Sequence, residues 1–366
     1  MKKIPILRIA LVGCGKAAEN HLLQIQHIPH VKLVSVCDRE PLMAKQLATR
    51  YAVPKSYADY ASMLERERPD AVHITTPPQS HSELAMTAFG YGCHVLMEKP
   101  LTCSHVDTQR LLASAKAADR KLTVAWGYYF DPIARDMRKL IRSGAIGEVV
   151  HVNSHFGYNL AGPFGSSVLS DSDHWVRGLP AKLIYNVADH IFNKIAEFLP
   201  GQEPALEAVM WPGDSALSQE NISTEMRVLI RDGLVTATAM FSAASRPVLH
   251  QFQIFGTKGT VALDFESGML SASVAPRIRG VLGSLLSGYS DAFRRLTYAN
   301  RNAIGLTTGQ FGHFAGLRFL CSSFYEAILA DCPAPISGDM ILKVSKLTDR
   351  VFSRPRLATW DEQQIA

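Results

Sequence analysis

The residues best suited to chemistry begin with a glycine-rich stretch, GCGKAA, at positions 13–18. Its first glycine permits a tight turn, its second lets the backbone approach a pyrophosphate, and its last small residue lets a helix pack closely on a strand. A helix that starts here offers free N–H groups and the positive end of its dipole to phosphates. The stretch therefore predicts a dinucleotide-binding loop made of Gly13, Gly15, Lys16, Ala17 and Ala18.

An acidic residue follows at a suitable distance for a nucleotide ribose. Asp38 ends the next apolar run, 23 positions after Gly15. A carboxylate there can bind both ribose hydroxyls, which favours NAD as the cofactor. The neighbouring Arg39 can stack on adenine or accept a 2′-phosphate, so NADP stays possible.

Two more polar clusters follow apolar runs. Thr76 and Pro77 end one run, and His81 comes in the first turn of the next helical stretch, as a cofactor contact or as a packing residue. Glu98 and Lys99 follow another run. Cofactors lie at the carboxyl ends of parallel strands, so these residues are expected beside the dinucleotide. The lysine can donate to a substrate hydroxyl and shift its proton equilibrium.

The elements that must position these residues fall into two domains, 1–128 and 129–366. In the first, strands alternate with helical stretches, which predicts a parallel sheet of the Rossmann type. Its strands are expected at Leu7–Val12, Val31–Cys37, Ala71–Thr75, Cys93–Met97 and Leu122–Ala125. Beyond Phe130 the strands follow one another without long helices, apart from one at Pro180–Leu199 and closing helices at Gly309–Ala330 and Gly338–Phe352. This pattern predicts an α+β domain with a large, mostly antiparallel sheet.

The motifs GCGKAA, CDR, TTPPQSH, GYGCHVLMEKPL and GAIGEV occur in this order. In sequence and spacing they resemble the Gfo/Idh/MocA oxidoreductase family, closely over the first 150 residues and by architecture over the rest. The resemblance implies that Lys99 lies near the nicotinamide and contacts the substrate. It also implies a catalytic acid/base, His190, on the long helix of the second domain. Asn186 stands where the family carries an aspartate.

The presence of asparagine instead of aspartate at position 186 affects how His190 can transfer a proton. Asn186 and His190 are one helical turn apart and share a face. An asparagine can orient an imidazole, but it cannot stabilise an imidazolium as a carboxylate does. Asp189 is rotated about 100° around the helix and is not expected to replace it. His190 is preferred as an acid/base over a structural histidine because an imidazole titrates near neutrality.

Substrate contacts are expected from two places. Asp173 and Trp175 lie in an irregular segment before the long helix, where they cover a polar ligand or, alternatively, anchor a plain loop. Tyr128 ends the first domain, in a stretch where the family often has Asn and Arg, which suggests a substrate pocket different from that of the polyol dehydrogenases. The expected activity is hydride transfer between NAD(P) and a secondary alcohol of a sugar, polyol or nucleotide-sugar derivative. The alternatives are an NAD-recycling sugar hydrolase or epimerase, and a non-catalytic cofactor-binding sensor.

The composition and charge of the chain limit the kinds of partner and cellular location that are expected. The 366 residues carry a formal net charge of +5 without a block of basic residues, which argues against a nucleic-acid partner. Six scattered cysteines form no close Cys/His cluster, so neither a metal site nor a disulfide framework is expected. The first apolar run ends at Gly13 and Gly15, as a strand does, rather than at a signal-peptide cleavage site. No apolar stretch is long enough to insert stably in a membrane, so a cytoplasmic protein is expected.

The segment Pro276–Thr308 is unusual because it holds five arginines and a single acid. Apolar residues recur in it at three- and four-residue steps, and glycines at 280, 283 and 288 are expected to interrupt the helix. Three interpretations stay open: an excursion packed on its own domain, a subunit contact and a peripheral membrane contact. Because the helix is expected to be short and broken, a subunit contact is preferred over a membrane contact. A homodimer or homotetramer is expected.

Overall fold

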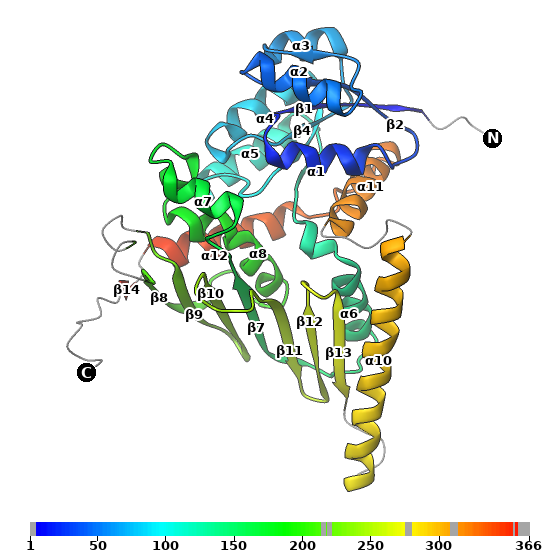
Figure 1. The fold of residues 1–366 in the computed structure, drawn as a ribbon, viewed down its shortest axis with the longest axis vertical. Coiled ribbons are helices and arrows are strands. Elements are labelled where there is room, and N and C mark those ends of the chain that lie inside the picture. The colour runs from blue at the N-terminus through cyan, green and yellow to red at the C-terminus, as the bar shows by residue number, and fades with distance from the viewer. Residues whose placement is uncertain are drawn as a thin grey trace. The chain divides into compact units, whose positions relative to one another are not determined.

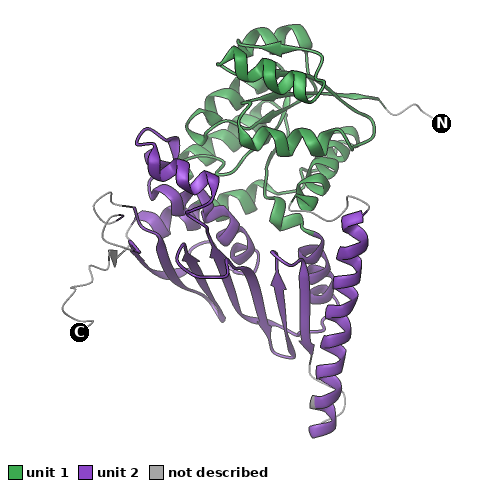
Figure 2. Ribbon diagram, viewed as in Figure 1, with its two compact units in different colours: residues 1–131, 314–345 green, residues 132–313, 346–366 purple. Residues whose placement is uncertain are grey.

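The computed structural model describes residues 5–213, 217, 222–274, 280–307, 314–353 and 356–357. It divides into two compact units (Figure 2). The first contains residues 1–131 and 314–345, and the second contains residues 132–313 and 346–366. The sequence had placed everything after residue 128 in the second domain, whereas the structure groups the segment 314–345 with the first.

The first unit is built on a six-stranded sheet in the order β3-β2-β1-β4-β5-β6, and every neighbouring pair is parallel. The predicted Rossmann-type sheet is therefore confirmed (Figure 1). The strands are β1 (Leu7–Val12), β2 (Val31–Cys37), β3 (Ser56–Tyr57), β4 (Ala71–Ile74), β5 (His94–Met97) and β6 (Leu122–Val124). The helices are α1 (Lys16–Ile25), α2 (Pro41–Arg50), α3 (Tyr60–Glu67), α4 (His81–Gly90), α5 (His105–Ala117) and α11 (Ala315–Leu329), with short 3₁₀ turns η1 (Pro78–Ser80) and η2 (Gly127–Phe130).

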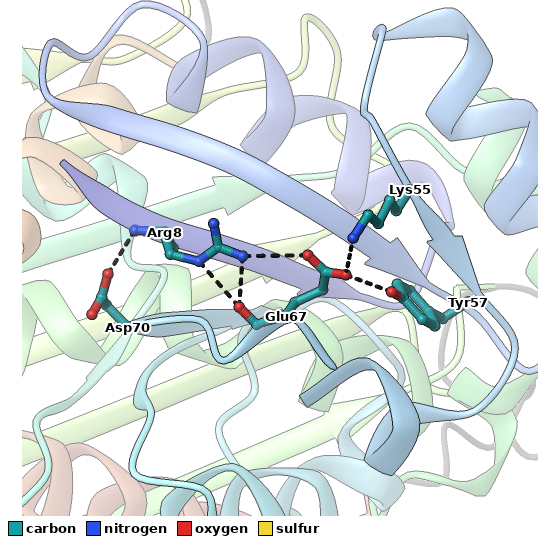
Figure 3. Close-up of polar contacts among 5 residues, drawn as sticks. All are labelled: Arg8, Lys55, Tyr57, Glu67 and Asp70. Carbon is teal, nitrogen blue, oxygen red and sulfur yellow. Dashed lines mark hydrogen bonds and ion pairs between the residues drawn. The ribbon is translucent and has the colours of Figure 1, made fainter. Parts of the chain in front are cut away.

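Strand β3 and helix α3 were not predicted. The buried Glu67 at the end of α3 holds this corner together (Figure 3). Its carboxylate accepts hydrogen bonds from Lys55 at 2.8 Å and Tyr57 at 2.5 Å, and Arg8 on β1 donates to it at 3.3 Å. Burial raises the pKa of Glu67, but these bonds outweigh it and lower the pKa overall. A short strand and a short helix are thus fixed by an ion-pair network that local sequence patterns do not reveal.

The second unit is built on an eight-stranded sheet in the order β13-β12-β11-β7-β10-β9-β8-β14. Its pairs are antiparallel apart from β10 with β7 and β14 with β8, which agrees with the predicted, mostly antiparallel sheet. The strands are β7 (Val149–Gly157), β8 (Ala205–Trp211), β9 (Glu225–Asp232), β10 (Val235–Ser242), β11 (His250–Gly256), β12 (Gly259–Asp264), β13 (Met269–Val274) and β14 (Arg356–Leu357). The helices are α6 (Pro132–Arg142), α7 (Pro163–Ser170), α8 (Lys182–Ala196), α10 (Val281–Thr307) and α12 (Gly338–Ser353), with the 3₁₀ turn η3 (Trp175–Gly178); the division between the units falls within α12.

Three of these helices differ from the sequence-based expectation. The helix α6 was missed, and α7 lies in a segment that was expected to be irregular. The prediction that glycines break the segment 276–308 was wrong, because α10 is one continuous helix of 27 residues. Gly283 and Gly288 lie inside it, and each costs about 1 kcal/mol relative to alanine. Contacts between α10 and the sheet, described below, offset that cost.

Candidate cofactor and active site

The first glycine of the loop after β1 is required by its surroundings. Gly13 has φ +94°, a conformation that side chains rarely adopt. A Cβ atom on it would lie 2.6 Å from Cγ2 and 2.7 Å from the backbone nitrogen of Thr76. The glycine therefore lets the turn after β1 pack directly against the turn after β4. This contact brings together two of the motifs on which the cofactor site was predicted.

The start of α1 has room for a phosphate group. A Cβ on Gly15 would meet no atom within 4 Å, and no side chain caps the helix. Gly15 and Lys16 are exposed and Ala17 is half-buried, while Ala18 is fully buried in a cluster with Leu11 and Leu22. The first N–H groups of a helix have no partner within it, so they can donate to an anion. These features fit the pyrophosphate of a dinucleotide.

Asp38 at the end of β2 binds the same loop. Its Oδ2 accepts the backbone N–H of Cys14 at 2.7 Å, and its Oδ1 accepts that of Glu40 at 2.9 Å. Each carboxylate oxygen can accept more than one hydrogen bond, so both remain able to bind ribose hydroxyls. Arg39 beside it is exposed. Asp38 thus combines a structural role with a position suited to the ribose.

His81 connects the turn after β4 with the turn after β5, both at the edge of the sheet where the cofactor is expected. It is fully buried, and its ring nitrogens lie 2.8 Å from the carbonyl oxygen of Thr76 and 3.0 Å from that of Leu101. Burial lowers the pKa of this histidine. Thr76 is half-buried and Pro77 is exposed at the end of β4. In this geometry His81 fixes the backbone around Thr76 and Pro77 instead of presenting its ring to a ligand.

A buried chain of hydrogen bonds ends at Glu98, directly before Lys99. Oε2 of Glu98 accepts the backbone N–H of Lys99 at 2.9 Å, and Oε1 lies 3.1 Å from Nε2 of His21 on α1. The chain then continues from His21 to His73 on β4, 2.8 Å between their Nδ1 atoms, and from Nε2 of His73 to the Tyr325 hydroxyl on α11, also 2.8 Å.

The proton positions in this chain follow from the ionisation of its members. Burial raises the pKa of Glu98, but the contacts with His21 and Lys99 outweigh it, so the carboxylate stays charged. Burial holds the pKa of His73 well below its usual range and that of Tyr325 well above. When His21 is neutral, the Tyr325 hydroxyl donates to His73, which donates to His21, which donates to Glu98. This order satisfies every group with both imidazoles neutral.

His21, His73 and Tyr325 were not identified from the sequence. His73 carries the clearest signal, because it is a histidine in the middle of an otherwise apolar strand. Tyr325 lies 252 positions away in the chain, and no local pattern connects the two.

In the second unit, α8 carries the predicted acid/base. Every residue from Leu183 to Ala196 is buried except His190, which is half-buried. Its ring stacks on Phe156 of β7, with ring centres 5.3 Å apart and planes inclined by 23°. Asn186 and Asp189 are both buried. His190 is thus the position on this part of the helix at which a side chain reaches the surface.

A buried lysine that was not predicted from the sequence lies one turn after His190. Lys194 is 3% exposed, donates to the carbonyl oxygen of His190 and lies 2.9 Å from Nε2 of His250 on β11. Burial lowers its pKa to about 7 and holds that of His250 well below the usual range. Phe156 lies between His190 and His250, with ring centres 5.3 and 4.7 Å away. Two titratable groups are therefore packed behind His190.

The segment before α8 is ordered by side-chain contacts. Arg177 donates to the carbonyl oxygens of Val168 and Leu169, at 2.8 and 2.7 Å, and so caps the end of α7. Trp175 stacks on His174 with ring centres 5.7 Å apart. Asp173 is exposed, Trp175 is half-buried, and Tyr128 of the first unit is half-buried as well. Substrate binding by Asp173, Trp175 and Tyr128 remains a prediction.

Known proteins resemble this chain in both units. A D-apiose dehydrogenase from Paraburkholderia graminis is 26% identical over 280 residues, which cover 73% of this chain and 72% of that protein. A D-glucoside 3-dehydrogenase from Escherichia coli is 28% identical over 144 residues, 39% of this chain and 41% of that protein. The WlbA dehydrogenase from Bordetella pertussis, solved with NADH and UDP-GlcNAcA, is 17% identical and superimposes with a TM-score of 0.76 over 95% of both chains.

Models of one family match most of the chain. Residues 7–126 match the oxidoreductase family with an NAD-binding Rossmann fold, and residues 134–262 match the GFO/IDH/MocA C-terminal domain. The cofactor is accordingly a nicotinamide dinucleotide, in agreement with the loop and helix start described above. From the sequence motifs, the fold and these matches, the chain belongs to the GFO/IDH/MocA oxidoreductase family.

Proposed function

We propose that this protein is an NAD-dependent dehydrogenase that oxidises a secondary alcohol of a sugar, polyol or nucleotide-sugar derivative. The observation that carries the proposal is the position of Lys99. It follows β5, and its backbone is held by Glu98, at the same edge of the sheet as the dinucleotide loop. Relatives named as D-apiose and D-glucoside dehydrogenases support a carbohydrate substrate.

Each proposed catalytic residue has a distinct task. When bound, the nicotinamide supplies the acceptor for the hydride. The Lys99 ammonium donates a hydrogen bond to the reacting hydroxyl and so stabilises negative charge as it develops on that oxygen. His190 takes up the hydroxyl proton as general base, because a neutral imidazole titrates in the working range. Asn186 lies one turn before His190 and contributes no charge to it.

The proposal also includes residues that bind the cofactor ribose and the substrate. Asp38 binds the ribose hydroxyls and gives NAD preference over NADP. Asp173, Trp175 and Tyr128 are the residues expected to contact the substrate. Aromatic rings offer an apolar face for a sugar, and carboxylates accept bonds from its hydroxyls.

The test measures NADH formation at 340 nm with a panel of sugars, polyols and nucleotide sugars as substrates. Lys99→Ala and Lys99→Arg are both expected to abolish turnover while NAD binding persists, because a planar guanidinium cannot replace a compact ammonium. Lys116→Ala, an exposed lysine on α5, serves as the control and should keep the wild-type rate. Wild-type rates in either Lys99 variant would refute the assignment. Substrate turnover without added NAD and without net NADH would indicate a cofactor-recycling hydrolase or epimerase.

A further inference from the structure

Helix α10 packs on its own unit through polar and small residues. Asp291 accepts the backbone N–H of Ala272 on β13 at 3.1 Å, and Asn302 donates to the carbonyl oxygens of Ser267 and Gly268, at 3.0 and 2.9 Å. Nearer α6, Tyr298 and Arg301 both contact Asp136, at 3.2 and 2.7 Å. Among the α10 residues whose burial is described, Gly283 and Gly305 are buried. Figure 1 shows α10 alongside β13, with its first turns extending past the end of the strand.

The opposite side of the helix is apolar and exposed, which inverts the usual arrangement of a surface helix. At 100° per residue, its exposed large apolar side chains other than Leu306 occupy an arc of about 140°, and Leu306 lies just beyond one edge of that arc. Each of them is between 46% and 89% exposed. We call this set the apolar face of α10: Val281, Leu282, Leu285, Leu286, Tyr289, Phe293, Leu296 and Ile304.

The charges around this face are positive. Asp291, the only acid of α10, is engaged by Ala272 and by Arg295, which lies 2.9 Å from it. Arg295 and Arg301 border the apolar face on its two sides, by the same 100° rotation per residue. Arg277 and Arg279, just before α10 in the sequence, lie outside the described residues. Each of these two arginines also pairs with an acid of its own unit, Arg295 with Asp291 and Arg301 with Asp136. Their side chains nevertheless stay 58% and 46% exposed, so the apolar face has partly exposed arginines at both borders.

We propose that the apolar face of α10 binds an anionic lipid surface, with the helix lying in the plane of the membrane interface. Leucines and aromatic rings on one side and arginines along the border are the pattern of such helices. Anionic headgroups complement the arginine margin. No helix among the described residues is long and apolar enough to span a bilayer, so the contact is peripheral.

The same features argue against a second copy of this chain as the occupant. A helix pair in a coiled coil buries a narrow seam, whereas this arc is about twice as wide as such a seam needs. Pairing two copies would also bring their positive margins together. The continuity of α10 removes the reason for which the sequence favoured a subunit contact, a short helix broken by glycine.

Vesicle flotation tests this proposal with the full-length protein. Vesicles of phosphatidylcholine alone are compared with vesicles that also contain phosphatidylglycerol, at low and high salt. The wild type is expected to float with the anionic vesicles about tenfold more strongly than with the neutral ones, and salt should weaken the binding. Leu285→Ser with Phe293→Ser should lower binding about tenfold, since it removes buried apolar area. Arg295→Gln should lower it less.

The control is Leu234→Ser, which removes a still more exposed leucine from the β9–β10 hairpin and should bind like the wild type. NAD binding, measured by fluorescence, checks that each variant is folded, and no readout depends on the substrate. Failure of the wild type to float with anionic vesicles would overturn the proposal. So would flotation unchanged by the double substitution. A wild-type dimer in light scattering that becomes a monomer in the double variant, without vesicle binding, would identify a second copy as the occupant and overturn it as well.

Discussion

The Nδ1 atoms of His21 and His73 lie 2.8 Å apart inside the first unit. Two imidazole nitrogens at this distance share one proton in a hydrogen bond, so one ring must donate and the other accept. The ionised Glu98 at one end and the Tyr325 hydroxyl at the other decide the direction. The backbone next to Lys99 is therefore anchored to a chain of bonds that reaches α11.

The tautomers of these two rings can be observed directly. We expect His73 to carry its proton on Nδ1 and His21 to carry its proton on Nε2. Long-range ¹H–¹⁵N correlation spectra distinguish the two forms. A proton on Nδ1 of His21, or an imidazolium at His73 near neutral pH, would contradict the arrangement. His73→Phe should destabilise the fold by about 1–3 kcal/mol, because it leaves buried groups without partners.

Asp38 is expected to determine cofactor preference. Asp38→Ala should weaken NAD binding by roughly 1–3 kcal/mol, the range of charge-assisted hydrogen bonds. Titration of intrinsic fluorescence with NAD and NADP measures both affinities. Because Asp38 also holds the N–H groups of Cys14 and Glu40, Asp38→Asn, which keeps one acceptor oxygen, separates the loss of loop geometry from the loss of charge. Equal or tighter binding of NADPH by the wild type would show that Arg39 governs the choice.

The proposed role of His190 as general base, with Asn186 one turn away, predicts how the rate depends on pH. If His190 is the general base, the rate of alcohol oxidation should rise with pH through a group that titrates near neutrality. His190→Asn should remove this limb. Asn186→Asp should move it upward, because a carboxylate one turn away raises the pKa of an imidazole. Asn186→Ala is the matched control, since it changes the contact without adding charge. A profile that none of these substitutions alters would assign the proton transfer to another group.

The lowered pKa of Lys194 predicts that the free energy of unfolding depends on pH. Its pKa is lowered from 10.5 to about 7 by burial, so the folded protein gives up a proton that the unfolded chain keeps over this interval. Between these two pH values the unfolded state binds more protons, and the free energy of unfolding should rise with pH by about 1.4 kcal/mol per unit. Below pH 7 both states hold the proton, and this group adds no further slope.

Urea denaturation of the wild type and of Lys194→Met at pH values from 7 to 10 measures this contribution. The difference between the two proteins should grow in favour of the wild type as the pH rises. A constant difference would mean that Lys194 stays charged in the folded state. His250→Phe, which removes the partner at 2.9 Å, tests whether the slope depends on that contact.

Local sequence patterns were sufficient to predict the parallel sheet of the first unit and its nicotinamide dinucleotide cofactor. Gly13, Gly15 and Asp38 follow the carboxyl ends of strands, and parallel strands place all such ends at one edge of a sheet. Spacing along the chain therefore predicts their positions without knowledge of distant contacts. The change of pattern after Phe130 indicated the second sheet for the same reason, because alternation and turns are local.

Features that arise from contacts between distant segments could be seen only in the three-dimensional structure. His73 and Tyr325 meet across 252 positions, and the buried Lys194 contacts His250, which is 56 positions away. The amphipathic pattern of α10 was visible in the sequence, but periodicity cannot tell which face turns inward. The bonds of Asp291 and Asn302 to the β12–β13 region turn the polar face inward, and they leave the apolar face of α10 exposed.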